Sequence, residues 1–277
     1  MNPADISELN DLSRMVCQDI IAMTASAGTG HYLSSLSCAE ILVTLFFREM
    51  HIDASRPDWE DRDRFILSKG HAAPALYAVM ARKGYFPPEE LRSLRKLGTR
   101  LQGHPVSHLL PGLDASSGSL GQGLSTAIGI ALSARLDRQD FRVFCLMGDG
   151  ELQEGQVWEA MMTAAHFRVG NLVAIIDHNE LQATGRVNEI MSLGDLRGKL
   201  ESFGWKVYST DGHDIGAMAA VFQQIRRDRE GPVALVAGTV KGHGVPFLEN
   251  NLTYHSAPLS TEQFRKAMDY LGGTGPA

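Results

Sequence analysis

The sequence predicts an α/β fold with a mostly parallel central sheet and helices on both of its faces. Two short apolar runs, residues 143–147 and 172–176, have the length and composition of buried strands. A helical stretch at residues 154–167 separates them, and such a strand–helix–strand unit joins two parallel strands with a right-handed crossover. Helices and strands go on alternating as far as residue 236, which is the pattern of a parallel sheet covered on both sides.

The first half of the chain is predicted to be mainly helical. Apolar residues at helical spacing mark residues 6–27, a period that ends near Gly28. A capping-box pattern, Ser37 followed by Glu40, opens a second helix that runs to about residue 47. We then expect a strand at 64–67, a helix at 71–83, another beginning at Pro87-Pro88, a long irregular segment at 98–121 and a helix at 122–136.

The second half continues the alternation. Helices are expected at residues 193–203 and 215–227, with strands at 205–208 and 233–236. An irregular polar segment at 241–258 precedes a closing helix at 261–271. We therefore predict one domain over residues 1–271 and a frayed tail at 272–277.

Bulk properties exclude several classes of protein. The net charge of −6 and the lack of basic runs argue against a nucleic-acid partner. No apolar run approaches the ~20 residues of a membrane span, and the polar, acidic start does not resemble a secretory signal. The 3 cysteines are odd in number and are not spaced as metal pairs, so we expect buried thiols of a cytoplasmic protein.

Polar clusters follow both central strands directly. Gly148-Asp149-Gly150 comes after the first and Asp177-His178-Asn179 after the second. The carboxyl ends of parallel strands share one edge of the sheet, where open α/β sheets bind ligands. A carboxylate and an amide oxygen, completed by phosphate and water, suit Mg²⁺, and the helix after Gly150 can attract phosphate through its free N–H groups. The plain alternative is two ordinary turns between strand and helix.

The two clusters also resemble a known signature. GDGELQEG, followed after 28 intervening residues by the Asn of DHNELQATG, is similar to the diphosphate- and metal-binding motif of thiamine-diphosphate enzymes, and its EG resembles transketolases. The resemblance implies the thiamine-diphosphate-binding fold of the diphosphate (PP) domain. It also implies that the Asp149 and Asn179 side chains and the Leu181 carbonyl hold Mg²⁺, with Ca²⁺ or Mn²⁺ possible, and that Gly148 and Gly150 line the cofactor site.

Four further segments place a histidine in a loop that the topology brings to the same edge. A single loop histidine is more often a bystander, but four at element boundaries favour a function. Histidine suits a diphosphate and sugar hydroxyls because it donates and accepts hydrogen bonds and titrates near neutral pH. These histidines are His31, His71, His104 and His255.

The resemblance gives each of them a role. SKGHAAPALYA is similar to the transketolase segment whose histidine contacts the cofactor diphosphate, here His71. GHPVSHLLPGLDASSGSLGQG resembles a loop with a substrate-binding histidine and a platform beside the cofactor ring, and TYHSAPL resembles a loop that brings a histidine over the diphosphate and the reaction centre. The implied assignments are His31, His104 and His255 as catalytic, His71, Gly118, Leu120 and His255 as cofactor-binding, and Glu154 at a subunit contact.

One segment departs from the family pattern. Transketolases usually have Gly-His-Pro-Gly-Gly around the first substrate histidine, whereas this chain has Gly30-His31-Tyr32-Leu33-Ser34. A rigid turn of small residues has become bulkier and less constrained. Drift in a loop and an altered substrate pocket both explain the change, so the substrate stays open.

The resemblance covers nearly all of the chain but only the diphosphate-binding domain of a full transketolase. In this family, a glutamate from a separate pyrimidine-binding domain activates the cofactor. We therefore expect an N-terminal transketolase subunit that transfers a two-carbon ketol unit from a ketose phosphate to an aldehyde. It would be active only with a C-terminal subunit, in an assembly with two copies of each chain. Two alternatives are the same chemistry with an unusual sugar or carrier-bound acceptor, and a non-catalytic cofactor-binding relic.

Overall fold

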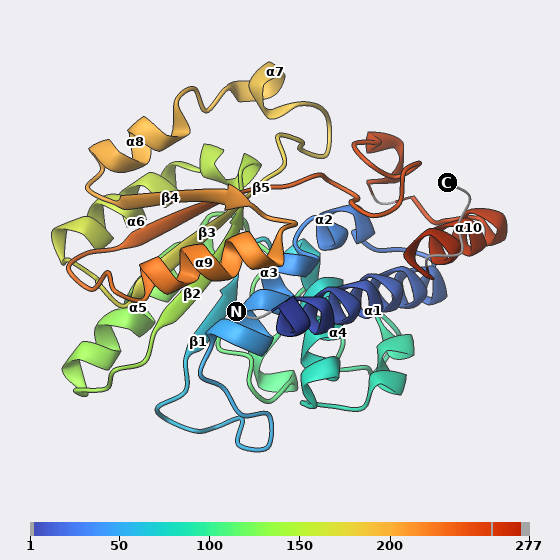
Figure 1. Cartoon of the computed structure of the whole chain (residues 1–277), viewed down its shortest axis with the longest axis horizontal. Coiled ribbons are helices and arrows are strands. Elements are labelled where there is room, and N and C mark those ends of the chain that lie inside the picture. Colours follow the sequence, from blue (N-terminus) through green and yellow to red (C-terminus); the bar gives the residue numbers. More distant parts are fainter. Residues whose placement is uncertain (1–2, 256, 273–277) are drawn as a thin grey trace.

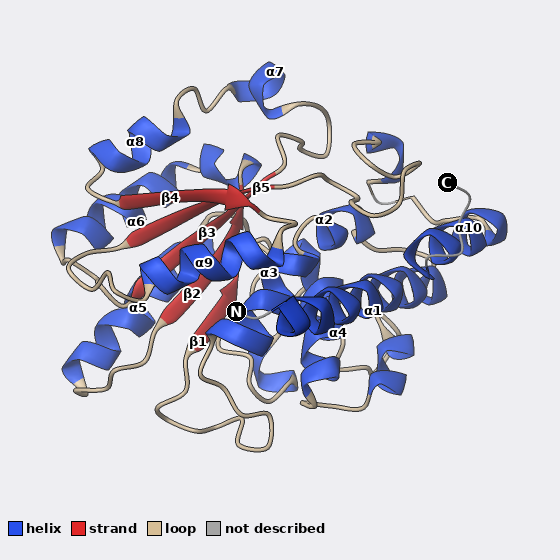
Figure 2. Cartoon of the chain, viewed as in Figure 1, coloured by secondary structure: helices blue, strands red, loops and turns tan. Residues whose placement is uncertain are grey.

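A five-stranded parallel sheet forms the centre of the protein in the computed structural model, which describes residues 3–255 and 257–272. The strand order is β1-β2-β3-β5-β4, and every neighbouring pair is parallel. Figures 1 and 2 show the five strands as one twisted layer. The strands are β1 (Arg64–Leu67), β2 (Val143–Gly148), β3 (Leu172–His178), β4 (Lys206–Asp211) and β5 (Val233–Gly238).

Helices cover both faces of this sheet because its strands are apolar on both sides. Along β2, Phe144 and Leu146 belong to one buried cluster, whereas Val143, Cys145 and Met147 belong to the other. The first cluster includes residues of α1 (Pro3–Ala27), α2 (Tyr32–Leu36), α3 (Ala39–Thr44), α4 (Ala73–Lys83), α9 (Ile215–Ile225) and α10 (Thr261–Gly272). The second includes residues of α5 (Gln122–Leu136), α6 (Gly155–His166), α7 (Val187–Met191) and α8 (Leu196–Ser202).

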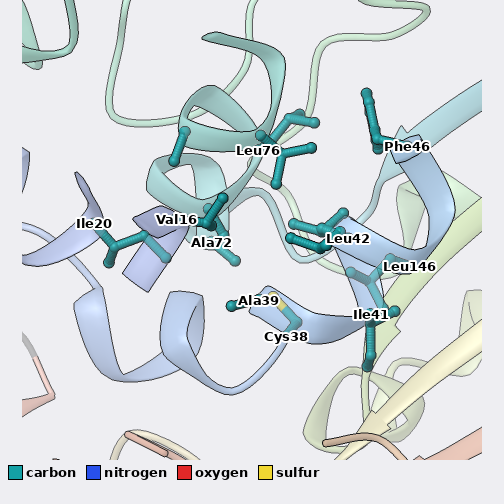
Figure 3. Packing of buried hydrophobic residues seen from close by; sticks show 14 of the residues in the cluster. Val16, Ile20, Cys38, Ala39, Ile41, Leu42, Phe46, Ala72, Leu76 and Leu146 are labelled. Carbon is teal, nitrogen blue, oxygen red and sulfur yellow. The ribbon is translucent and has the colours of Figure 1, made fainter. Parts of the chain in front are cut away.

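The first cluster fixes the N-terminal helices against the sheet. Figure 3 shows Val16 and Ile20 of α1 pointing toward residues of α3 and α4, with Leu146 of β2 beneath Leu42. The long α1 also packs against α10, which joins the first and last helices of the described chain (Figure 1).

The predicted strand–helix–strand unit is confirmed. β2 and β3 pair in parallel, with Val143 opposite Leu172, and α6 connects them. β4 runs three residues past the predicted end at residue 208, because Ser209, Thr210 and Asp211 pair with β5 although their side chains are not apolar. Backbone pairing, rather than the apolar pattern, sets the end of this strand.

The predicted capping box at Ser37 is wrong. The chain is already helical at Tyr32–Leu36, and Cys38 precedes α3 without a side-chain cap. The Ser37 hydroxyl donates instead to Asp177 Oδ1 at 2.7 Å, and Glu40 accepts from the Ser13 hydroxyl at 2.8 Å. Both side chains of the expected capping box therefore bind side chains from other segments of the chain instead of capping a helix.

Two other helix predictions were shifted. The segment after Pro87-Pro88 forms only a 3₁₀ helix, Pro88–Ser93, and the helix expected from residue 193 begins at Leu196. There the Asp195 side chain accepts from the Gly198 N–H at 3.0 Å and caps α8. Of the tail predicted at 272–277, Gly272 is the last residue of α10 and residues 273–277 lie outside the described part.

The three cysteines are buried and free, as predicted. Within residues 3–255 and 257–272, no helix combines the length and the apolar character that crossing a membrane requires.

Candidate active site

A pocket of about 440 Å³ lies at the carboxyl edge of the sheet. Its walls come from the turns after β2 and β3, the segment after β5 and the loops around residues 31, 71, 104 and 255. A larger surface hollow, of about 790 Å³, lies elsewhere around Lys206 and Asp228 and contains none of the predicted residues. All the predicted site residues line the carboxyl-edge pocket, namely His31, His71, His104, Gly118, Leu120, Gly148, Asp149, Gly150, Asn179, Leu181 and His255.

Asp149 is a buried carboxylate with backbone donors on both oxygens. Its Oδ1 accepts from the Gly150 N–H at 2.7 Å and its Oδ2 from the Glu180 N–H at 2.5 Å. Burial and the nearby Asp177 raise the pKa of Asp149 despite these donors. A carboxylate in this position gains from a cation, so its surroundings fit a metal ligand.

Asn179 and Leu181 supply two neutral oxygens beside it. The Asn179 amide donates to Ser37 Oγ at 3.1 Å, and its Oδ1 accepts from the Leu181 N–H at 3.1 Å. The Leu181 carbonyl accepts from the Lys241 ammonium at 2.8 Å. One carboxylate, one amide oxygen and one carbonyl are a donor set that suits Mg²⁺ or Ca²⁺.

A buried ion pair lies beneath these groups. Lys69 is 2% exposed and Asp177 is fully buried, and the ammonium donates to Asp177 Oδ2 and to the Ser34 carbonyl. Burial alone would raise the pKa of Asp177, but Lys69 and the Ser37 and Thr239 hydroxyls lower it below its ordinary value. Asp177 is thus ionised and neutralised by Lys69, which leaves Asp149 as the carboxylate open to a further cation.

Glu151 ties the turn after β2 to the loop before α5. Its carboxylate accepts from the Gly121 N–H at 2.8 Å, from the Gly148 N–H at 3.1 Å and from the Ser68 hydroxyl. The loop that it holds carries Gly118 and the part-exposed Leu120. Gly118 has φ +152°, a backbone conformation that favours glycine, and it lies in contact with the His104 ring.

Three histidine rings meet above the metal-ligand candidates. The His31 ring lies 5.4 Å from that of His71 and 5.2 Å from that of His255, both edge-on. Burial, together with His255 and Arg95 nearby, lowers the pKa of His31 to about 4. Burial and neighbouring positive charge also lower the pKa values of His71 and His255. Neutral imidazoles at physiological pH offer one donor and one acceptor each.

The departure at residues 32–34 lies inside the protein. Tyr32, Leu33 and Ser34 are each at most 2% exposed, and of the three only Ser34 lines the pocket. The Tyr32 hydroxyl donates to the Ala257 carbonyl at 2.8 Å, across 225 positions of sequence. These residues are core residues of α2 rather than residues of a solvated loop.

Four charged residues of this site had no role predicted from the sequence. Lys69, Glu151, Asp177 and Lys241 are each at most 3% exposed, and apart from Asp177 all of them line the pocket. Lys69 and Asp177 both stand close in sequence to predicted site positions. The sequence did offer one signal for Lys69 and Asp177, because each is a charged residue at the end of an apolar strand. Charged residues are buried only when they are paired, so such a position predicts a buried ion pair.

The sequence matches the family model described as the thiamine diphosphate binding domain of transketolase over residues 7–276. It is 42% identical over 248 residues to a 6-deoxy-6-sulfo-D-fructose transketolase subunit of Clostridium sp. strain MSTE9, covering 90% of each chain. It is 36% identical to an apulose-4-phosphate transketolase subunit of Phocaeicola vulgatus, covering 90% of this chain and 88% of that one. The human transketolase is 40% identical over 255 residues, but the match covers only 40% of its length.

Solved structures show the same relation. The Campylobacter jejuni transketolase superposes with a TM-score of 0.89 at 30% identity, covering 100% of this chain and 44% of that one. A Pichia stipitis transketolase in complex with sedoheptulose 7-phosphate superposes with a TM-score of 0.88 at 29% identity, covering 97% and 41%. The chain thus spans about two fifths of these longer proteins.

Proposed function

This chain belongs to the transketolase family, and we propose that it is the diphosphate-binding subunit of a two-chain enzyme that transfers a ketol unit from a ketose phosphate to an aldehyde. The observation that carries the proposal is the convergence of Asp149, Asn179 and Leu181 with four histidines on one pocket. These groups come from segments more than 200 positions apart, and a fold alone does not require them to meet.

Asp149, Asn179 and the Leu181 carbonyl would hold Mg²⁺, or Ca²⁺ or Mn²⁺, together with the diphosphate of thiamine diphosphate. Their oxygen donor set supports this assignment. His71 and the Lys241 ammonium would face the diphosphate, since a buried lysine favours an anionic ligand. When bound, thiamine diphosphate supplies a thiazolium carbon that adds to the donor carbonyl and accepts its electrons.

The remaining histidines would act on the substrate. With pKa values below the ordinary range, His31, His104 and His255 are neutral at physiological pH. Each can accept a proton from a sugar hydroxyl and return it. Gly118 and Leu120 would form a platform beside the cofactor ring and keep water from the reacting atoms.

A separate C-terminal subunit with the pyrimidine-binding domain would complete the site. Two relatives of matching length are themselves named as subunits, which supports this. Leu120 is 36% exposed at the rim of the pocket, where a partner could cover it. We expect two copies of each chain, with Glu154 at a subunit contact, in the cytoplasm, where the free cysteines stay reduced.

The sugar substrates stay open. The two subunit relatives are named for a sulfo-sugar and for a branched-sugar phosphate, and residues 32–34 depart from the usual pattern. We therefore favour a substrate other than the commonest pentose phosphates. Efficient use of xylulose and ribose phosphates by the wild-type chain with its partner would contradict this preference. A non-catalytic relic is the other alternative, and any ketol transfer by the assembled enzyme would exclude it.

Calorimetric titration of thiamine diphosphate and Mg²⁺ tests the metal assignment. Asp149→Ala should abolish metal-dependent cofactor binding and leave the chain folded, although the Gly150 and Glu180 N–H groups lose their acceptor. Asp140→Ala is a matched control, since its side chain is 96% exposed and it precedes β2, at the edge of the sheet opposite to the pocket. Unchanged cofactor affinity in Asp149→Ala would refute the assignment.

Exchange of the thiazolium proton tests the need for a partner. The chain alone should show no accelerated exchange and no turnover, and adding the co-purified partner should restore both. Rapid exchange by the single chain would overturn the two-chain proposal.

A further inference from the structure

A second group of buried and partly buried polar side chains lies on the other side of the segment that carries Lys241. The Ser13 hydroxyl donates to Glu40 Oε1 at 2.8 Å, and the His213 ring meets Glu40 Oε2 at 2.9 Å through Nδ1. The Val240 N–H donates to Nε2 of the same ring at 2.8 Å. Helices α1 and α3, the turn after β4 and the segment after β5 are thereby joined in one chain of hydrogen bonds.

The partners determine which nitrogen of His213 carries the proton. Because the Val240 N–H is a donor, Nε2 must present its lone pair. Nδ1 therefore carries the proton and donates to the Glu40 carboxylate. Both oxygens of Glu40 and both nitrogens of His213 then have a hydrogen-bond partner. We call this chain of hydrogen bonds, Ser13–Glu40–His213–Val240, the relay.

Glu40, His213 and His243 could also suggest a metal site, because one ligand atom of each lies within 4.8 Å of the others. The two rings are stacked, with centroids 3.6 Å apart and planes inclined by 21°. An imidazole lone pair lies in its ring plane, and one ion cannot lie in two separate, nearly parallel planes. Both nitrogens of His213 are also occupied, so the arrangement favours a relay over a metal site.

The position of Lys241 depends on its main chain. Its side chain is buried, and among residues 3–255 and 257–272 it forms no ion pair within 4.0 Å. Its ammonium is held by two carbonyls, Leu181 at 2.8 Å and Gln182 at 3.2 Å. The backbone is fixed on both sides, at Val240 by His213 and at Gly242 by the Leu33 carbonyl at 3.1 Å.

We propose that His213 is a positioning residue of the cofactor site. Backed by Glu40, it fixes the main chain at Val240 so that the Lys241 ammonium points at the Leu181 carbonyl and the place of the diphosphate. The inference rests on the proposed function, and it adds a residue that touches neither cofactor nor substrate.

Variants of the full chain test this with two measurements. The first is amide hydrogen exchange at Val240, followed by NMR without any ligand. The second is the affinity for inorganic pyrophosphate with Mg²⁺, measured by calorimetry. Lys241→Met should weaken pyrophosphate binding about 10–100-fold, the value of a charge-assisted hydrogen bond, and leave Val240 protected.

His213→Ala should speed exchange at Val240 and weaken pyrophosphate binding about 3–30-fold. Combined with Lys241→Met, it should add nothing to the loss from Lys241→Met alone, because it acts through that lysine. His213→Gln should restore both measurements, since its amide accepts from Val240 and donates to Glu40. Glu40→Gln should also preserve them, because its amide can turn its oxygen to His213 and its nitrogen to Ser13.

Several results would overturn the inference. They are unchanged exchange at Val240 in His213→Ala, additive losses in the double variant, or no rescue by His213→Gln. Should His213→Ala not fold, His213→Asn replaces it, because the shorter amide cannot reach both partners. Absence of pyrophosphate binding by the wild-type chain would contradict the proposed function, while exchange at Val240 would still decide whether the relay holds the segment.

Discussion

Replacing Lys69 by Met tests whether the buried ion pair under the pocket determines the stability of the site. The variant keeps most of the side-chain volume but removes the ammonium from Asp177, which is fully buried. Breaking a buried pair from one side leaves an uncompensated charge and costs about 3–5 kcal/mol. Asp177 keeps the Ser37 and Thr239 hydroxyls as donors, so we expect a loss near the lower end, about 3 kcal/mol.

For a domain of this size, the loss corresponds to a drop of about 6–12 °C in the melting temperature. Urea unfolding followed by circular dichroism measures the free energy directly. Arg14→Met is the control, because Arg14 and Asp11 form an ion pair with side chains 51% and 62% exposed. The control should lose less than about 1 kcal/mol.

The effect should also depend on pH. Without Lys69, burial raises the pKa of Asp177 above its unfolded value, so the folded chain binds a proton that the unfolded chain releases. The difference from wild type should therefore shrink as the pH falls, and Asp177→Asn combined with Lys69→Met should recover most of the loss. A loss no larger than that of Arg14→Met, or one that grows in acid, would refute the reasoning.

Three further predictions concern the histidines and Tyr32. His104→Ala should lower ketol transfer about 10²–10⁴-fold in the assembled enzyme and leave cofactor affinity nearly unchanged, whereas His71→Ala should first raise the cofactor concentration required; equal effects on cofactor titrations would contradict this division. The pKa of His31 lies at about 4 when folded and near 6.5 when unfolded, so the unfolded chain binds more protons between these values and stability falls as the pH drops through that window. His31→Asn should flatten this slope in urea unfolding at pH 7 and pH 5, and an unchanged slope would show that His31 does not contribute. Tyr32→Phe should destabilise the protein by about 0.5–1.5 kcal/mol and speed hydrogen exchange around residue 255, because it removes the bond to the Ala257 carbonyl; unchanged exchange there would show that Tyr32 does not hold this loop.

The sequence by itself determined the parallel sheet and the edge at which the site lies. Residues 143–147 of β2 and 172–176 of β3 are all apolar because both faces of these strands are buried, and this pattern is readable without a structure. The positions of Asp149 and Asn179 follow directly, since each comes at or just after a strand end. The resemblance to transketolases then supplied roles for the histidines, and the structure places all of them on one pocket.

Only the tertiary structure decided how the buried charges are paired. Lys69 and Asp177 lie 108 positions apart, and Lys241 reaches a carbonyl 60 positions away. Ser37 and Glu40 looked like a capping box because local patterns describe only neighbours in sequence, whereas each is bound to a partner from a distant segment. The partner of a buried charge is set by the three-dimensional packing and not by closeness in sequence. An unpaired buried charge costs several kcal/mol, which is comparable to the whole free energy of unfolding of a domain.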